Sequence, residues 1–266
     1  MERGQRGNWA LVLGPGGPVG TAWLAGLAAG LREAGVDPAA AEPIAGTSAG
    51  AIAGAMIAAG RDLAAVAELP PPGGPRPAAD PSVMERVFGL LRDPALAPDE
   101  ARRRVGGLAM EATALPAEWH RERMRFLVGT DDWPDRPLLI TGVDVASGEP
   151  VVWDRTSGVP LSAAVAASSA APGYARPVEI GGRFYMDGAF GGGSWPWLAE
   201  GADAVVLIEP FAHMSDGSGG DVRIVPDEAA LEAFGGDVGD VTRWSRCYRA
   251  GVRQAPEAAR LLATVT

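Results

Sequence analysis

A serine with a glycine two residues away on either side, in Gly46-Thr47-Ser48-Ala49-Gly50, constrains the fold of this chain more than any other feature. The preceding residues 41–45 have the pattern of a short strand, and residues 49–59 are small and apolar enough for a closely packed helix. A serine at such a strand-to-helix elbow sits on strained backbone with its hydroxyl clear of the sheet. It also lies at a helix N-terminus, where backbone N–H groups favour developing negative charge. We therefore interpret Ser48 as a candidate nucleophile in an α/β fold.

A glycine-rich turn near the N-terminus is the second constraint. An apolar strand at residues 11–13 runs straight into Gly14-Pro15-Gly16-Gly17-Pro18-Val19-Gly20, and residues 21–31 carry apolar side chains at helical spacing. Turns of this kind also cradle pyrophosphate, but Val19 stands where the dinucleotide fingerprint needs its last glycine. No Lys-Ser or Lys-Thr follows, so the P-loop motif fails too. The turn is better suited to an oxyanion hole, aimed at the carbonyl oxygen of an ester that Ser48 attacks.

An aspartate late in the chain is the third element of the pattern. Met186-Asp187-Gly188-Ala189 follows a strand predicted at residues 183–186. At the end of a strand, Asp187 is well placed to reach a site at the carboxyl edge of a parallel sheet. Taken alone, it is equally compatible with a turn residue that caps its own backbone. As a base it needs a pKa above the ordinary value near 4, which partial burial would provide.

These three motifs, in this order, resemble the patatin-like phospholipase family, and the resemblance extends from residue 9 to about residue 210, including the segment 141–149. The resemblance implies lipid acyl hydrolase activity of phospholipase A, lysophospholipase or esterase type, through a Ser-Asp dyad and without a cofactor. By position, it implies Ser48 as the nucleophile that carries the acyl group and Asp187 as its base. It further implies that the N–H groups of Gly16 and Gly17 form the oxyanion hole.

The glycine-rich turn departs from the family pattern Gly-Gly-Gly-x-Arg/Lys-Gly. Pro15 removes one possible N–H donor, and Val19 stands in place of the usual cation. The departures leave the nucleophile and the base intact. They keep open a second class of function, a non-catalytic lipid-binding relative with a degraded oxyanion hole.

Histidine offers a rival mechanism, because the common serine hydrolases use imidazole as the base. The chain contains only His120 and His213. His120 lies in a charged, helix-like stretch and is interpreted as a surface residue. His213 follows a late strand, where the Ser-Asp-His order of α/β-hydrolases would place its base. A Ser-His-Asp esterase that uses His213 is therefore the alternative to the dyad.

Composition limits the classes of function and partner. Of 266 residues, 47% are hydrophobic and 21% charged, which is typical of a globular protein, and the net charge of −10 weighs against nucleic acid as a partner. With one cysteine and two distant histidines, no metal site is expected. The polar N-terminus lacks the pattern of a signal peptide, so we expect a cytoplasmic protein. The expected partner is a lipid or other acyl ester, with transient contact to a membrane surface; the oligomeric state stays open.

The order of predicted elements indicates one domain. Strand and helix signals alternate from residue 9 to about residue 59, as in a parallel sheet with helices on both faces. Proline-rich residues 70–77 interrupt this pattern, and three helices are predicted at residues 82–91, 98–110 and 116–126. We expect residues 1–266 to form a single three-layer α/β/α hydrolase domain with a mostly parallel central sheet. Residues 61–132 are expected to be a helical insert or cap within it.

Overall fold

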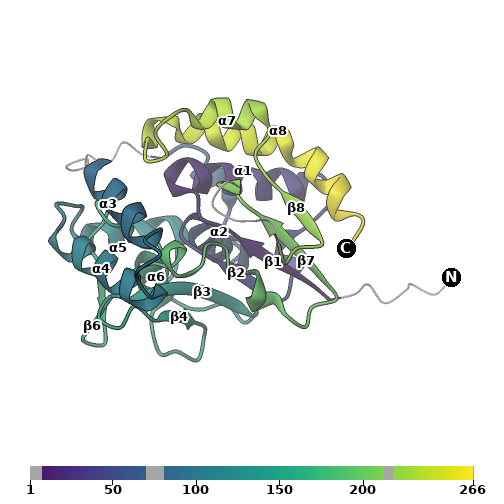
Figure 1. The fold of residues 1–266 in the computed structure, drawn as a ribbon. Coiled ribbons are helices and arrows are strands. Elements are labelled where there is room, and N and C mark those ends of the chain that lie inside the picture. Colours follow the sequence, from purple (N-terminus) through teal and green to yellow (C-terminus); the bar gives the residue numbers. More distant parts are fainter. Residues whose placement is uncertain (1–7, 70–80, 213–217, 266) are drawn as a thin grey trace.

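The computed structural model describes residues 8–69, 81–212 and 218–265. In this part of the chain, one central sheet is flanked by helices on both faces (Figure 1). The strands of the sheet are β1 (Trp9–Leu13), β2 (Ile44–Gly46), β3 (Leu138–Asp144), β4 (Pro150–Trp153), β5 (Val178–Ile180), β6 (Arg183–Asp187), β7 (Ala204–Ile208) and β8 (Val222–Ile224).

Hydrogen-bonded neighbours in the sheet follow the order β5-β6-β3-β2-β1-β7-β8, and β4 pairs with β3. The pairs β1 with β2, β1 with β7, β2 with β3, and β7 with β8 are parallel. The pairs of β3 with β4 and with β6, and of β5 with β6, are antiparallel. The expected mostly parallel sheet is therefore confirmed, with its antiparallel part at the end that carries β6.

The α-helices are α1 (Gly17–Glu33), α2 (Ala49–Ala58), α3 (Pro81–Leu91), α4 (Pro98–Glu111), α5 (Ala117–Val128), α6 (Leu161–Ser168), α7 (Glu228–Phe234) and α8 (Trp244–Leu262). Short 3-10 helices are η1 (Pro38–Ala40), η2 (Leu63–Val66), η3 (Gly188–Gly191), η4 (Pro196–Ala199) and η6 (Val241–Arg243). Within the described residues, every helix is too short or too polar to span a bilayer.

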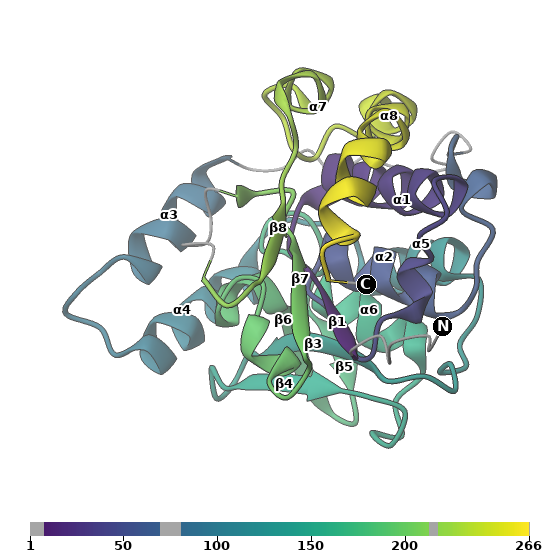
Figure 2. The same ribbon diagram turned by 90° about the vertical axis from the view of Figure 1, so that its right-hand side faces the viewer.

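The helices form two layers that enclose the sheet, which confirms the three-layer α/β/α fold. The main core packs alternate strand residues such as Leu11, Leu13 and Ile140 against α1, α2, α5, α6 and α8. On the opposite face, α3 and α4 pack over Val143 and Met186, and η4 covers the sheet near β1 and β7. Figure 2 shows α3 and α4 on one side of the sheet and α1, α2 and α8 on the other.

Two helices contain a proline. α1 begins at Gly17, ahead of the apolar helical spacing at residues 21–31, because Pro18 stands in the first turn, where a missing N–H costs nothing. α8 continues through Pro256 in its interior. The close packing of α8 on α1 offsets the one helical hydrogen bond that Pro256 removes.

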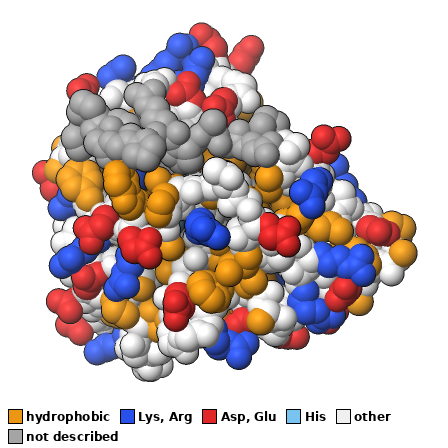
Figure 3. Space-filling view, turned by 90° about the vertical axis from the view of Figure 1, so that its left-hand side faces the viewer, with side chains coloured by type: hydrophobic (Ala, Val, Ile, Leu, Met, Phe, Trp, Pro, Cys, Tyr) orange, Lys and Arg blue, Asp and Glu red, His pale blue; other side chains and the backbone are white. Residues whose placement is uncertain are grey.

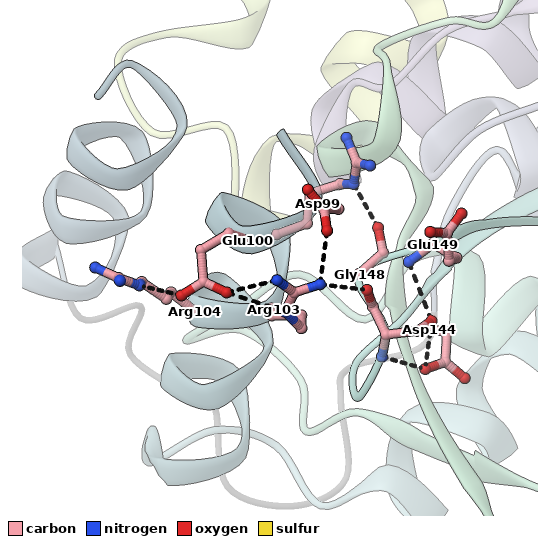
Figure 4. A network of polar contacts seen from close by, with 9 residues as sticks. Asp99, Glu100, Arg103, Arg104, Asp144, Gly148 and Glu149 are labelled. Carbon is pink, nitrogen blue, oxygen red and sulfur yellow. Dashed lines mark hydrogen bonds and ion pairs between the residues drawn. The ribbon is translucent and has the colours of Figure 1, made fainter. Parts of the chain in front are cut away.

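Polar contacts attach α4 to the turn that joins β3 to β4 (Figure 4). Arg102 Nε donates to the Gly148 carbonyl, and Arg103 Nη1 donates to the carbonyl of Ser147 at 3.4 Å. Arg103 is itself oriented by ion pairs with Asp99 and Glu100, each with an N–O distance of 2.7 Å. The helix that follows α3 is therefore anchored directly beside the end of β3.

Candidate active site

Ser48 lies on the strand-to-helix elbow between β2 and α2, as its flanking glycines predict. Its backbone is in the positive-φ region (φ 55°, ψ −114°), which is strained for a residue with a side chain. The close approach of neighbouring backbone explains both flanking glycines. A Cβ atom at Gly46 would lie 2.4 Å from the Gly50 carbonyl oxygen, and one at Gly50 would lie 2.0 Å from the Leu13 carbonyl oxygen. No larger residue fits at either position.

The glycine-rich turn lies directly beside this elbow. The Thr47 N–H donates to the Leu13 carbonyl at 3.0 Å, and the Gly50 N–H donates to the Gly14 carbonyl at 3.1 Å. Gly16 caps the N-terminus of α1 and Gly17 is its first residue. Within the part of the chain that the structure describes, no acceptor is bound to the N–H of either Gly16 or Gly17.

β3 brings the elbow and Asp187 together. β4 pairs with one edge of β3, at Ile140 and at Gly142. On the opposite edge, Ile140 pairs with Gly46 of β2 and Gly142 pairs with Asp187 of β6. Since β2 runs parallel to β3 and β6 runs antiparallel to it, the two strands end facing each other along a single edge. Ser48 Oγ donates a hydrogen bond of 2.7 Å to Asp187 Oδ2.

Asp187 is almost completely enclosed, with 3% of its surface exposed. Its second oxygen, Oδ1, accepts a hydrogen bond of 2.9 Å from the Ala189 N–H. Burial raises the pKa of Asp187 to about 7, while the hydrogen bonds from Ala189 and Ser48 act in the opposite direction. A carboxyl with this pKa can both accept and return a proton near neutral pH.

The last residue of α6 and the segment after it contact the backbone of Ser48 and Asp187. Ser48 N–H donates to Ser168 Oγ at 3.1 Å, and Asp187 N–H donates to the Ala170 carbonyl at 3.1 Å. Sequence reasoning did not identify Ser168 as part of the site. The only signal available was its place at the end of a short run of small residues before Asp187.

The loop between α7 and α8 packs against the glycine-rich turn. A Cβ atom at Gly17 would lie 2.8 Å from the Val238 carbonyl oxygen. One residue further on, a Cβ atom at Gly239 would lie 2.5 Å from the ring of Tyr174, which lies in the segment after α6. The loop therefore contacts both the glycine-rich turn and the segment that follows α6.

His120 takes no part in the contacts described above. The expectation that His120 is a surface residue is wrong: its side chain is buried, with 8% of the residue exposed. His120 Nε2 lies 3.1 Å from the Ala166 carbonyl oxygen and 3.0 Å from Ser169 Oγ, so it joins α5 to α6. Burial lowers its pKa to about 4, which keeps the ring neutral at physiological pH. His213, the alternative base, lies outside the described residues.

Metal ligation finds no support in the described part of the chain, where no group of three or more histidine, cysteine, aspartate or glutamate side chains is arranged to hold an ion.

Comparison with known proteins gives relatives for about two thirds of the chain. An uncharacterised NTE family protein of Mycobacterium tuberculosis is 33% identical over 183 residues, which is 67% of this chain and 42% of that protein. A protein of Mycobacterium bovis with the same description matches equally well. The chain thus spans less than half the length of these relatives.

Solved structures with a related arrangement include VipD from Legionella pneumophila, with a TM-score of 0.43, 16% identity, and coverage of 77% of this chain and 50% of VipD. The type III effector protein ExoU has a TM-score of 0.42 and 17% identity, and covers 96% of this chain and 53% of its own. The model of the family described as patatin-like phospholipase matches residues 11–193, which include the glycine-rich turn, the elbow and Asp187. This chain belongs to the patatin-like phospholipase family.

Proposed function

We propose that this protein is a lipid acyl hydrolase that cleaves carboxylic esters through an acyl-enzyme on Ser48, with Asp187 as the base. The hydrogen bond of 2.7 Å from Ser48 Oγ to Asp187 Oδ2 carries this proposal. This bond links the hydroxyl of Ser48, whose backbone is strained, to the buried carboxyl of Asp187. The chain belongs to the patatin-like phospholipase family. Phospholipase A, lysophospholipase and simple esterase reactions all use this same chemistry.

In the first half of the reaction, Ser48 Oγ attacks the ester carbonyl carbon and its proton passes to Asp187. The negative charge that develops on the carbonyl oxygen is stabilised by the N–H groups of Gly16 and Gly17 and by the N-terminal end of α1. The tetrahedral intermediate then expels the alcohol, which takes the proton from Asp187 as it leaves. The acyl group stays on Ser48 as an ester.

In the second half, water attacks the acyl-enzyme. Asp187 accepts a proton from the water, and the hydroxide equivalent adds to the acyl carbon. Collapse of this second intermediate releases the fatty acid, while Asp187 returns the proton to Ser48 Oγ. One group therefore serves as base and acid in turn, which requires a pKa near the working pH, such as the value of about 7 that burial gives Asp187.

Within the expected insert at residues 61–132, we propose that α3 and α4 form a cap that binds the acyl chain. Val83 of α3 and Val105 of α4 share an apolar cluster with Met186 and Phe190, which flank Asp187 on either side in the sequence. On the face shown in Figure 3, hydrophobic side chains alternate with charges of both signs. Such a face favours a lipid through apolar contact, in transient encounters with a membrane surface, rather than through charge.

The test is hydrolysis of p-nitrophenyl esters of increasing acyl length by the full chain and its variants. Ser48→Ala and Asp187→Asn are each expected to lower kcat by about 10³-fold or more, since the dyad acts as a unit. Ser157→Ala and Asp135→Asn change the same residue types at exposed sites, and both should retain wild-type rates. Preference for long chains would support the proposed cap, and preference for short chains would contradict it.

Two outcomes would replace the proposal. Loss of activity in His213→Ala, with Asp187→Asn active, would assign a triad that uses His213. Absence of hydrolysis and of labelling by a fluorophosphonate in the wild type would favour the lipid-binding relative, with Pro15 and Val19 as the reason for a degraded oxyanion hole.

A further inference from the structure

Ser168 is a buried hydroxyl that the proposed reaction does not use. It is the last residue of α6, in a helix of small side chains, and none of its surface is exposed. Its Oγ accepts the N–H of Ser48 at 3.1 Å. A buried hydroxyl at the end of an apolar helix costs free energy unless its hydrogen bond contributes to the structure around it.

The contacts of the elbow show what this hydrogen bond does. The N–H groups of Thr47 and Gly50 are bound by backbone carbonyls of Leu13 and Gly14, which belong to β1 and the turn after it. Between them, the N–H of Ser48 is bound by a side chain instead. Ser48 also has the positive φ of 55°, so its peptide group most needs a fixed orientation. The Ser168 hydroxyl is the contact that restrains this group.

The same short segment restrains Asp187. Two residues after Ser168, the Ala170 carbonyl accepts the Asp187 N–H at 3.1 Å. Ser168 therefore binds the backbone of the proposed nucleophile through its side chain, and Ala170 binds that of the proposed base through its carbonyl. A shift of the Ser48 or Asp187 backbone would strain one of these contacts, between which the Ser48 Oγ to Asp187 Oδ2 distance is 2.7 Å.

We propose that Ser168 is a positioning residue, whose hydroxyl holds the Ser48 peptide group so that Ser48 Oγ points at Asp187. This inference rests on the proposed function of the dyad. It has a second consequence for the site: with its N–H bound to Ser168, Ser48 does not contribute to the oxyanion hole, which leaves that role to Gly16 and Gly17.

Removal of the hydroxyl would leave the Ser48 N–H without an acceptor in a site that is only 7% exposed at Ser48. The peptide group is then free to rotate, and Ser48 Oγ spends less time within reach of Asp187. We expect Ser168→Ala to lower kcat about 10- to 100-fold with little change in KM, because the alteration affects the attack and not the binding of the acyl chain.

The pH profile distinguishes positioning from a general structural role. The hydrogen bond from Ser48 lowers the pKa of Asp187, against the larger effect of burial. If Ser168→Ala weakens that hydrogen bond, the pKa of Asp187 rises further. The rising limb of kcat/KM against pH should then move to higher pH than in the wild type. A change confined to protein stability would leave its midpoint unchanged.

The experiment measures ester hydrolysis, the rate of fluorophosphonate labelling and thermal unfolding for wild type, Ser168→Ala and Ser169→Ala. Ser169 is the matched control, because its hydroxyl contacts His120 and the Val165 carbonyl rather than the elbow. Ser169→Ala should retain activity within about threefold of wild type. Equal kcat values and equal pH profiles for the two alanine variants would overturn the inference.

If Ser168→Ala does not fold, a second pair of variants tests the positioning role of Ser168. Ser168→Thr and Ser168→Val have the same shape and differ in the hydroxyl alone. We expect the threonine variant to label and hydrolyse at least tenfold faster than the valine variant, and equal rates would refute the positioning role. Failure of the proposed function is recognised separately, because wild type and Ser169→Ala would then both lack labelling and hydrolysis.

Discussion

Burial of Asp187 has two effects: it favours the proposed reaction, and it lowers the stability of the folded protein. Its enclosure raises the pKa to about 7, which makes the carboxylate basic enough to accept a proton from Ser48. The same enclosure means that the ionised form is poorly solvated in the folded protein. Ionised Asp187 therefore acts as the base in the proposed reaction and also destabilises the fold. The reaction rate and the stability should both depend on pH for this reason.

The first consequence concerns the rate. If ionised Asp187 is the base, kcat/KM for a p-nitrophenyl ester rises with pH and levels off above a midpoint of about 7. Below the midpoint the rate should fall about tenfold per pH unit. A profile measured from pH 4 to pH 9, on protein shown to stay folded, provides the test. A midpoint near 4 would mean that Asp187 is not buried as described.

The second consequence concerns stability. Between pH 4 and pH 7, folded Asp187 keeps a proton that the unfolded chain has released, so its contribution to stability falls as the pH rises through this window. Asp187→Asn removes the ionisation. We expect its free energy of unfolding to exceed that of wild type by a margin that grows from pH 4 to pH 8, up to roughly 4 kcal/mol for a shift of about 3 pKa units.

Urea unfolding of both proteins at several pH values measures this margin. Asp135→Asn, at an exposed site, should show a difference from wild type that does not depend on pH. A pH-independent margin for Asp187→Asn as well would contradict the buried ionisation.

At the scale of single elements, α4 carries two adjacent glycines with different surroundings. A Cβ atom at Gly106 would lie 2.8 Å from the carbonyl oxygen of Val145, in the turn to which α4 is attached. A Cβ atom at Gly107 would meet nothing within 4 Å. Gly106 therefore allows α4 to approach the end of β3 closely, whereas Gly107 points into open space.

Alanine at these two glycines should have opposite effects on stability, so each variant serves as the control for the other. Gly107→Ala should raise the free energy of unfolding by up to about 1 kcal/mol, because alanine is the better helix former. Gly106→Ala should lower it by roughly 1–3 kcal/mol, because the methyl group pushes α4 from the turn. Thermal unfolding of both variants tests the prediction. Stabilisation by Gly106→Ala would mean that α4 does not pack closely on the turn.

At the scale of the whole molecule, α8 packs the C-terminal part of the described chain against α1, near its beginning. α8 lies outside residues 11–193, the part that the family model matches, yet it packs along α1 (Figure 1). Glycines make this contact close: a Cβ atom at Gly26 would lie 2.0 Å from the Tyr248 carbonyl oxygen, and one at Gly251 would lie 2.2 Å from that of Trp23. α1 begins at Gly17, so α8 supports the helix whose N-terminus belongs to the candidate oxyanion hole.

Separation of these two helices should therefore affect both stability and activity. Gly251→Ala is expected to destabilise the fold by roughly 1–3 kcal/mol or more, since backbone on both helices must move. It should also lower kcat for ester hydrolysis at a temperature where the variant is folded. Gly89→Ala, in open space on α3, is the control: it should not destabilise the fold, and as a better helix former it should raise the free energy of unfolding by up to about 1 kcal/mol. Unchanged stability in Gly251→Ala would contradict the close contact.

Much of the fold was predictable because its signals are local. The strands predicted at residues 11–13, 41–45 and 183–186 and the helices predicted at residues 82–91, 98–110 and 116–126 lie within a few residues of β1, β2, β6, α3, α4 and α5. α6 was not anticipated, because a helix that is buried on every side has no amphipathic pattern. The burial of His120 was missed for a related reason: its charged neighbours along the chain are solvated, but its own side chain faces α6.

In the candidate site, too, the residues in local motifs were predictable and the contacts between distant residues were not. Ser48 and Asp187 belong to motifs with recognisable neighbours, so both were identified as candidates. Their hydrogen bond depends on the pairing of Gly46 and Asp187 with the same edge of β3, which is a long-range register that no local pattern encodes. The contact of Ser168 with Ser48 arises across 120 positions of sequence and was invisible for the same reason.

The shared edge of β3 also has an evolutionary consequence. Pairing with β3 sets the spacing between the ends of β2 and β6. We therefore expect that changes in the length of the segments connecting these three strands leave the contact of Ser48 with Asp187 in place. If residues 61–132 form the proposed cap, exchange of that segment between relatives would change the substrate and preserve the reaction.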